Sequence, residues 1–451
     1  MRKATILGLF IAVAVEPAFG QAARPPSAAA PARPAPPPAS QPSAAKPAVV
    51  STPDSRSAAI LATSTEPTFD EGTFARLKDA LLSYSGLQVR GGWPTLPGDA
   101  KLGPGSTGPA VVLLRQRLAV TEDLAADKQR GDAYDGAVEA GVRHFQLRHG
   151  LDATGIVDPQ TLAALNVPVK KRLQQLAASL ERLAGMDFIF GARYVVVNIP
   201  AAYTEAIAND KVERRYRVIV GKADKPSPTL TTMITSVNLN PTWTVPLSIT
   251  KNEVITKMRK DPTYLSRMHM RVLGPNDSEI DPASVDWSST RSPNFSIRQD
   301  SGSWNALGAV KIDMPNPYSV YMHDTNSRNL FTANYRFLSH GCTRVDNVRD
   351  LAAWILEDTP GWSRAQIDAG IATGQRTEIR LSRKIPVAWV YLTGWMTRNG
   401  TVQFRDDVYD HDEDPVSPTS KGSLVAAGDA GGFVRPRETR GIKQVSNLDS
   451  R

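Results

Sequence analysis

The sequence lacks the residues that several common kinds of protein site require. It has one cysteine, Cys342, in 451 residues, which excludes an intramolecular disulfide. Its six histidines show no HExxH or other clustered ligand pattern, so we predict no metal and no cofactor. Past residue 20, no run of about 20 apolar residues is present, so the mature chain is expected to be soluble.

The first 20 residues have the pattern of an export signal. Arg2 and Lys3 precede an apolar run, Ala4 to Val15, and the stretch Ala18-Phe19-Gly20 offers small residues to a signal peptidase. We therefore predict a signal peptide over residues 1–20 and an exported protein of the periplasm or cell wall. A buried N-terminal helix or an uncleaved anchor is the alternative.

Two further segments are poor in the residues that build a core. Residues 22–50 hold nine of the 34 prolines and no aromatic residue, which predicts a disordered Pro/Ala-rich tether over 21–68. Residues 396–451 form a C-terminal extension, expected to be disordered from about 412.

The net charge of +8 suits an anionic partner such as a cell-wall polymer, and no nucleic-acid motif is present.

Apolar residues at helical spacing mark the region before residue 190. We predict a helical scaffold over 69–99 and 168–190, with a small unit of three helices between them, over 100–167. Asp158 and Pro159 have the chemistry of a helix N-cap and first turn, and Gly150 is expected to end the preceding helix.

From residue 191 the pattern changes to strands. Stretches such as "YVVVNIPAAYTEAI" and "VAWVYLTGW" alternate and are rich in β-branched residues, so we assign a strand-rich domain to 191–395. An irregular, partly helical stretch at about 251–300 is predicted to be an insertion between strands. The fold class is therefore α+β.

The lone cysteine lies in the stretch "LSHGCTRVDN". An unpaired cysteine in an exported protein indicates a reactive thiol or an intermolecular bond, and an inert buried cysteine is the alternative. His323, expected to end a strand, lies 19 residues earlier and would reach the thiol through a hairpin-like return. A neutral imidazole there can take the thiol proton, with Asp324 as its candidate partner through side chain or backbone.

The neighbours of Cys342 add to this reading. Gly341 allows a sharp turn that brings backbone amides toward an oxyanion. Arg344 can bind a substrate carboxylate through two hydrogen bonds or form a structural ion pair. His340 is either a second base or, as we favour, a residue that holds the loop.

With these residues in view, the sequence resembles the L,D-transpeptidases of bacterial cell walls. Ser339, His340, Gly341 and Cys342, followed by Thr343 and Arg344, match the family's Ser-His-Gly-Cys-x-Arg pattern, with His323 upstream. Stretches such as "NPTWTVPLSI" and "YMHDTNSRNLF" resemble the large subfamily with a capping insertion. The stretch "FQLRHGLDATGIVD" resembles a peptidoglycan-binding helical domain. The resemblance covers roughly residues 69 to 395.

The resemblance implies a catalytic domain built as a mixed β-sheet sandwich and a cysteine acyltransferase. Cys342 would be the nucleophile and His323 the acid/base, acting on a donor stem tetrapeptide. D-alanine would leave, and the diamino acid of an acceptor stem would resolve the thioester into a 3→3 cross-link. Carbapenems would acylate the same sulfur. The amides of Gly341 and Cys342 would serve the oxyanion hole.

Aromatic residues near the motif are candidates for the wall of the donor pocket. Tyr321 or Tyr318 is expected to line the donor pocket, whereas Trp304 and Trp243 are weaker candidates.

Water in place of the acceptor would make the protein an L,D-carboxypeptidase or a related hydrolase. A non-catalytic wall-binding protein is the second rival, with glycan held by the helical unit.

Overall fold

The computed structural model describes residues 65–289 and 293–413. The predicted signal peptide, nearly all of the predicted tether and the tail from residue 414 lie outside the described residues. Within the described part of the chain, none of the helices is both long enough and apolar enough to cross a bilayer.

The described chain contains a nine-stranded sheet in the order β11-β3-β12-β10-β9-β4-β13-β1-β2. In chain order its strands are β1 (Arg193–Asn198), β2 (Tyr203–Ala208), β3 (Lys211–Gly221), β4 (Leu230–Leu239), β9 (Val310–Asp313), β10 (Met322–His323), β11 (Phe337–Ser339), β12 (Thr343–Val345) and β13 (Thr377–Val390).

This sheet is mixed and closes on itself. Strand β2, at one end of the order, pairs with β1 on one side and on the other with β3, the second strand from the opposite end. The pairs β1–β13, β10–β12 and β11–β3 are parallel, and the remaining pairs are antiparallel. The predicted α+β class with a mixed β-sheet sandwich as the catalytic domain is confirmed, and the strands of this domain close into a barrel.

Both faces of the sheet are buried around β1. Val195 and Val197 belong to one apolar cluster, whereas Tyr194 and Val196 belong to a second cluster on the other face. Because successive strand side chains point to opposite faces, a run of apolar residues without polar alternation suits a strand covered on both sides.

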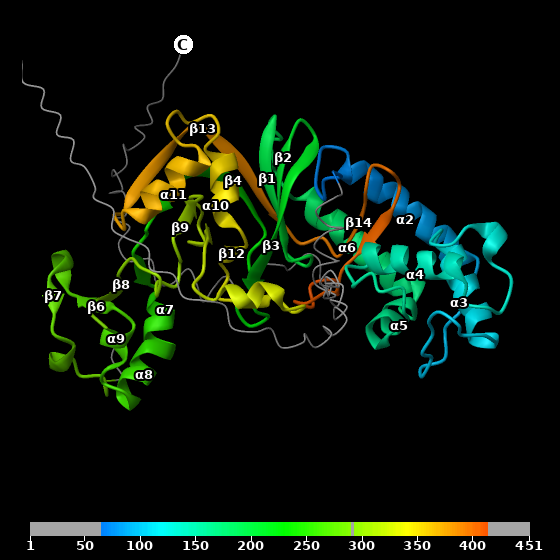
Figure 1. Ribbon diagram of the computed structural model, residues 1–451, viewed down its shortest axis with the longest axis horizontal. Coiled ribbons are helices and arrows are strands. Elements are labelled where there is room, and N and C mark those ends of the chain that lie inside the picture. Colours follow the sequence, from blue (N-terminus) through cyan, green and yellow to red (C-terminus); the bar gives the residue numbers. More distant parts are fainter. Residues whose placement is uncertain (1–64, 290–292, 414–451) are drawn as a thin grey trace, which may run out of the picture. The chain divides into compact units, whose positions relative to one another are not determined.

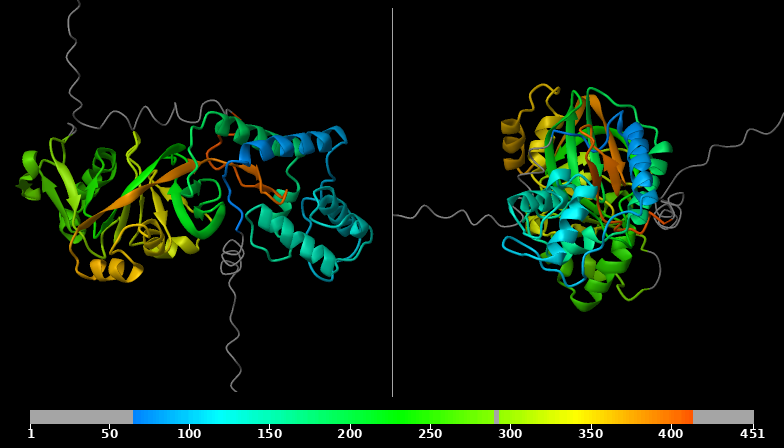
Figure 2. Two further views of the ribbon diagram at one scale, coloured as in Figure 1. Left: turned by 90° about the horizontal axis from the view of Figure 1, so that it is seen from above. Right: turned by 90° about the vertical axis from the view of Figure 1, so that its right-hand side faces the viewer.

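Helices cover these two faces. Strands β4 and β9 and helices α10 (Val348–Ile355) and α11 (Arg364–Ala372) contribute to the first cluster, and Figure 1 shows α10 and α11 beside the sheet. Helices α2 (Thr73–Val89) and α6 (Val169–Ala184) contribute to the second cluster. They run alongside one another in Figure 2, next to the hairpin of β14 (Gly394–Met396) and β15 (Val402–Phe404).

The three-helix unit has its own apolar core. Its helices are α3 (Pro109–Val120), α4 (Gly136–Arg148) and α5 (Pro159–Leu165). The predicted cap of α5 is confirmed: the Asp158 carboxylate accepts a hydrogen bond of 2.7 Å from the Thr161 N–H, with Pro159 in the first turn. Gly150 follows α4 with φ +71°, a left-handed conformation that suits glycine after a helix.

A second small sheet lies in the excursion between β4 and β9. These two strands are hydrogen-bonded neighbours, so residues 240–309 leave the main sheet and return to it. The excursion holds β5 (Trp243–Val245), β6 (Met270–Leu273), β7 (Glu279–Ile280) and β8 (Ser296–Gln299), with α7 (Leu247–Ile249), the π-helical turn η2 (Thr250–Val254), α8 (Ile255–Lys260) and α9 (Tyr264–Arg267). It packs around a separate apolar cluster.

Candidate active site

The register of β10 and β12 sets the positions of the predicted site residues. Met322 pairs with Thr343 and His323 with Arg344, and the Thr343 N–H donates to the Tyr321 carbonyl at 3.1 Å. Met322 and Thr343 are fully buried toward the core. Because side chains alternate along a strand, the flanking residues share the opposite face, called here the active face: Tyr321, His323, Cys342 and Arg344.

If the register of β10 and β12 is continued by one residue, Cys342 pairs with Tyr321. His323, which pairs with Arg344, is then the diagonal neighbour of Cys342. Diagonal neighbours in a sheet are separated by roughly 7–8 Å, within reach of longer side chains. The hairpin-like return expected from the sequence is wrong, because β10 and β12 run parallel. The chain between them first visits β3 through β11, as a parallel pair requires a crossover.

Both members of the Cys342–His323 pair are neutral in the resting site. Burial raises the pKa of the Cys342 thiol to about 11, against opposing contributions from Tyr321, Lys311 and Arg344. Burial, and then the positive charge of Arg344, lower the pKa of His323 to about 3. The Asp324 backbone counteracts part of this lowering, although within the described chain no contact of His323 Nδ1 has hydrogen-bond geometry.

The turn before Cys342 is shaped by Ser339 and Gly341. Gly341 has φ +110°, a conformation that favours glycine. Its N–H donates to Ser339 Oγ at 3.1 Å, and Ser339 Oγ donates to the Cys342 carbonyl at 2.5 Å. The Gly341 amide expected in the oxyanion hole is therefore occupied, whereas among the described residues the Cys342 N–H has no hydrogen-bond partner.

His340 connects the nucleophile turn to the insertion. Its Nε2 lies 2.7 Å from Oε1 of Glu253 in the π-helical turn η2. π-helical turns are rare and occur often at functional sites. The contact matches the loop-holding role favoured from the sequence.

The Asp324 carboxylate has partners other than the imidazole. Oδ2 accepts from the Ala309 N–H at 2.9 Å, and both oxygens accept from Arg328 Nη2 at 3.0 Å. No hydrogen bond joins this carboxylate to His323 within the described residues. Asp324 therefore fixes the loop that follows His323.

Arg344 presents a positive charge without an acidic partner. No ion pair or hydrogen bond of its guanidinium is found in the described chain, and its Nε is buried without a partner. Burial also lowers the pKa of Arg344, opposed by the nearby Cys342. Lys311, opposite His323 in the register, is instead paired with Asp313 at 2.6 Å.

The predicted aromatic residues divide into two groups. The Tyr321 ring centroid lies 5.6 Å from that of His323, and Lys311 lies over the Tyr321 ring at 4.6 Å. Tyr318 and Tyr321 both pack against the main core, and Trp243 of β5 is a hydrogen-bond partner of the Tyr321 side chain. Trp304 stacks on His269 of the insertion, with 3.7 Å between the ring centroids. Tyr321 is thus the predicted aromatic residue whose ring lies beside His323.

Sequence reasoning missed four residues around the nucleophile turn. No motif marked Lys311, although it lies within the predicted strand "AVKID". The remaining three belong to distant segments and carried no local signal: Ser227, Glu253 and Tyr409. Among the described residues, no group of three or more His, Cys, Asp or Glu side chains is arranged to hold a metal ion.

Two parts of the chain match known protein families. Residues 192–363 match the YkuD model, described as "L,D-transpeptidase catalytic domain". Residues 107–165 match the model described as "Putative peptidoglycan binding domain". The resemblance predicted from the Ser-His-Gly-Cys motif is confirmed.

A protein of Haemophilus influenzae named "Putative L,D-transpeptidase" is 31% identical over 260 residues, which are 56% of this chain and 52% of that protein. The chain thus spans about half the length of this curated relative.

Solved structures of L,D-transpeptidases are also similar to this chain. An L,D-transpeptidase from Mycobacterium smegmatis is 14% identical, with 44% of this chain and 58% of that chain covered and a TM-score of 0.22. One from Stackebrandtia nassauensis is 12% identical, with 66% and 96% covered and a TM-score of 0.25. Both TM-scores are too low for the superpositions to place any residue of this chain.

Proposed function

We propose that this chain, whose residues 192–363 match the model of an L,D-transpeptidase catalytic domain, is a cysteine acyltransferase that makes 3→3 cross-links between peptidoglycan stem peptides. The observation that carries the proposal is the β10–β12 register, which makes Cys342 and His323 neighbours on one face. A thiol beside a buried imidazole whose Nδ1 has no partner among the described residues suits nucleophilic catalysis.

In the first step the donor is loaded onto the enzyme. His323 takes the thiol proton as Sγ of Cys342 attacks the carbonyl carbon of the third residue of a donor tetrapeptide. The oxyanion of the tetrahedral intermediate accepts a hydrogen bond from the Cys342 N–H. The C–N bond then breaks, D-alanine leaves with the imidazolium proton, and a thioester remains on the sulfur.

In the second step the acceptor resolves the thioester. The side-chain amine of the acceptor's diamino acid attacks the thioester carbonyl and gives a proton to His323. The C–S bond breaks, the sulfur regains its proton from the imidazolium, and the new amide is the 3→3 cross-link.

The pKa values of the pair oppose proton transfer from Cys342 to His323 before the donor binds. With the thiol near 11 and the imidazole near 3, the resting enzyme holds a thiol rather than a thiolate. Such a sulfur is slow to react with stray electrophiles. The proton moves when the donor carbonyl is in place, so His323 acts as a general base.

Arg344 is the residue we assign to the donor. Its guanidinium, which has no acidic partner among the described residues, shares the active face with the thiol. Such a planar cation suits a stem-peptide carboxylate. Tyr321 lies on the same face and would border the donor chain.

The three-helix unit suits work at the cell wall. Its match to a peptidoglycan-binding model supports glycan strands as its ligand, and the predicted export signal supports a periplasmic or wall location. Carbapenems, as strained amides, would load the same sulfur.

The test is to incubate the protein with tetrapeptide muropeptides and analyse the products by mass spectrometry. We expect 3→3 dimers with loss of D-alanine from the wild type and none from Cys342→Ala. Tripeptides without dimers would indicate the carboxypeptidase instead. Dimers from Cys342→Ala would refute the assignment of the nucleophile.

A further inference from the structure

Three consecutive peptide units around Cys342 are each held by a hydrogen bond. Ser339 Oγ binds the first unit at the Gly341 N–H and the third at the Cys342 carbonyl. The middle unit joins Gly341 to Cys342, and its carbonyl accepts a hydrogen bond of 2.7 Å from Ser227 Oγ. Ser227 lies 114 residues away in sequence, in the loop after β3.

The middle unit decides where the Cys342 N–H points. A peptide unit is planar, and in the trans form its C=O and N–H point in opposite directions. Fixing the Gly341 carbonyl therefore fixes the direction of the Cys342 N–H. Because Gly341 has φ +110° and no side chain, this unit would otherwise have more rotational freedom than its neighbours.

Ser227 is itself held by Tyr409 of the C-terminal segment. The buried Ser227 hydroxyl accepts from the Gly221 N–H at 2.9 Å. Tyr409 Oη donates to the Gly221 carbonyl at 2.5 Å and accepts from the Ser227 N–H at 3.3 Å. One phenol thus ties together the end of β3 and the backbone of Ser227.

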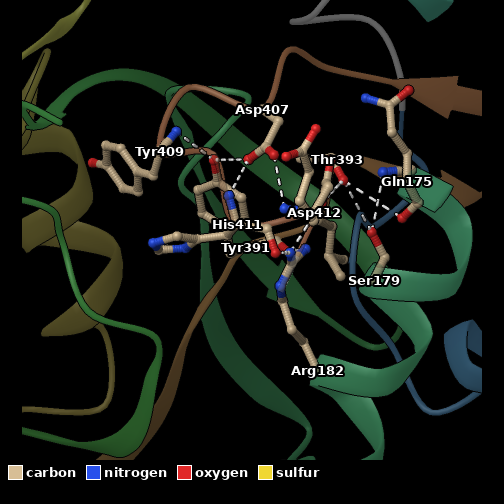
Figure 3. A network of polar contacts seen from close by, with 12 residues as sticks. Gln175, Ser179, Arg182, Tyr391, Thr393, Asp407, Tyr409, His411 and Asp412 are labelled. Atoms are coloured by element: carbon tan, nitrogen blue, oxygen red, sulfur yellow. Dashed lines mark hydrogen bonds and ion pairs between the residues drawn. The ribbon is translucent and has the colours of Figure 1, made fainter. Parts of the chain in front are cut away.

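A buried polar network anchors Tyr409, as Figure 3 shows. The Tyr409 N–H donates to Tyr391 Oη at 2.9 Å, and this hydroxyl donates to Asp407 Oδ1 at 2.7 Å. Asp407 also accepts from the backbone N–H groups of the next turn, and Asp412 in that turn forms a buried ion pair of 2.9 Å with Arg182 of α6.

We propose that Ser227 and Tyr409 are positioning residues that aim the Cys342 N–H at the oxyanion of the acyl-transfer intermediate. The inference rests on the proposed function and extends it to a segment beyond residues 192–363, the part that matches the catalytic family model. In this assignment the C-terminal segment is part of the catalytic apparatus, although none of its side chains touches the substrate.

The experiment compares two reactions of the same sulfur in the full-length protein. Acylation by a carbapenem forms an oxyanion, whereas alkylation by iodoacetamide forms none. We expect Ser227→Ala to slow acylation by about 10- to 100-fold, part of the loss caused by removing an oxyanion donor, while alkylation at one alkaline pH is unchanged. Ser227→Thr, which keeps the hydroxyl, should restore acylation.

Tyr409→Phe is the second variant, with an expected fall in acylation on the order of threefold to tenfold. Tyr216→Phe is its matched control, because the Tyr216 hydroxyl is buried without a partner in the described chain. It should change neither rate. Should Ser227→Ala fail to fold, Tyr409→Phe decides the question on the same two rates.

The outcomes separate this inference from the proposed function. Equal losses of acylation and alkylation, or no loss of acylation in Ser227→Ala and Tyr409→Phe, would overturn the positioning role. A wild-type protein that is alkylated yet never acylated, by carbapenem or tetrapeptide, would overturn the acyltransferase proposal and this inference with it.

Discussion

Two polar regions of this chain are built in opposite ways. Where the three-helix unit meets the β14–β15 hairpin and α6, buried arginines are almost fully hydrogen-bonded. On the active face, His323 Nδ1 and Arg344 Nε are buried without partners in the described part of the chain. The arginines of the junction are Arg117, Arg148, Arg172 and Arg405.

The charged side chains of the junction bind other groups of the protein. Arg148 binds the buried carboxylate of Asp123 through Nε at 2.6 Å and donates to the Val402 carbonyl of β15 at 3.3 Å. Arg405 donates to the Arg148 carbonyl at 3.1 Å, and Arg117 stacks on Trp93 at 4.1 Å. Satisfied networks of this kind rigidify a structure.

On the active face, by contrast, the positive charge of Arg344 is available to a ligand. His323 Nδ1 and Arg344 Nε are buried without partners within the described residues, and each such group has a free-energy cost in the folded state. The comparison teaches that the two regions differ in how a buried positive charge is balanced: Arg148 is paired with the buried carboxylate of Asp123, whereas Arg344 has no acidic partner among the described residues. It predicts that changes on the active face reduce activity and spare stability, and that changes at the junction do the reverse.

The largest expected effect comes from His323→Gln. Without the imidazole no base takes the thiol proton, so the acylation rate with a carbapenem should fall by about 10²- to 10⁴-fold. The melting temperature should change little, because within the described residues Nδ1 has no partner at hydrogen-bond geometry. His144→Gln, at a half-exposed position on α4, is the control and should acylate normally. An acylation rate close to wild type in His323→Gln would contradict the role of the base.

The junction is tested by Asp123→Ala. Removing this carboxylate leaves Arg148 buried without its counter-charge, which should lower the free energy of unfolding by about 3–5 kcal/mol. Acylation by the folded protein should be unchanged. Asp127→Ala, which breaks an exposed pair with Lys128, should cost less than about 1 kcal/mol. Denaturant unfolding measures both.

The same variant has a pH signature. Burial alone would raise the pKa of Asp123, but the charge and hydrogen bonds of Arg148 hold it at about 2, below its value in the unfolded chain. The stability it contributes is therefore complete above about pH 4 and is lost as the pH falls through 2. Asp123→Ala should lack this part of the acid destabilisation, and a retained loss would contradict the assignment.

The contrast also explains what could be predicted from the sequence. Cys342, His323 and the cap at Asp158 were recognisable because their chemistry lies in short motifs. The hairpin-like return was wrong because strand direction depends on β11 joining β3, a long-range pairing. Ser227 and Tyr409 lie 182 residues apart, and no local pattern marks two residues that meet only in the folded chain.

The substitution with the smallest expected effect is Arg344→Lys. It tests most directly whether the charge on the active face serves donor binding. Lysine keeps the charge but not the planar pair of donors, so KM for a donor tetrapeptide should rise about tenfold while kcat changes little. The matched control is Arg349→Lys on α10, where the arginine is already paired with Asp368 at 3.0 Å, and its KM should equal that of the wild type. A fall in kcat at constant KM would instead mean that the Arg344 charge acts on the sulfur. In that case its missing partner would be the thiolate formed during attack, and the unpaired charge would serve the chemical step rather than donor binding.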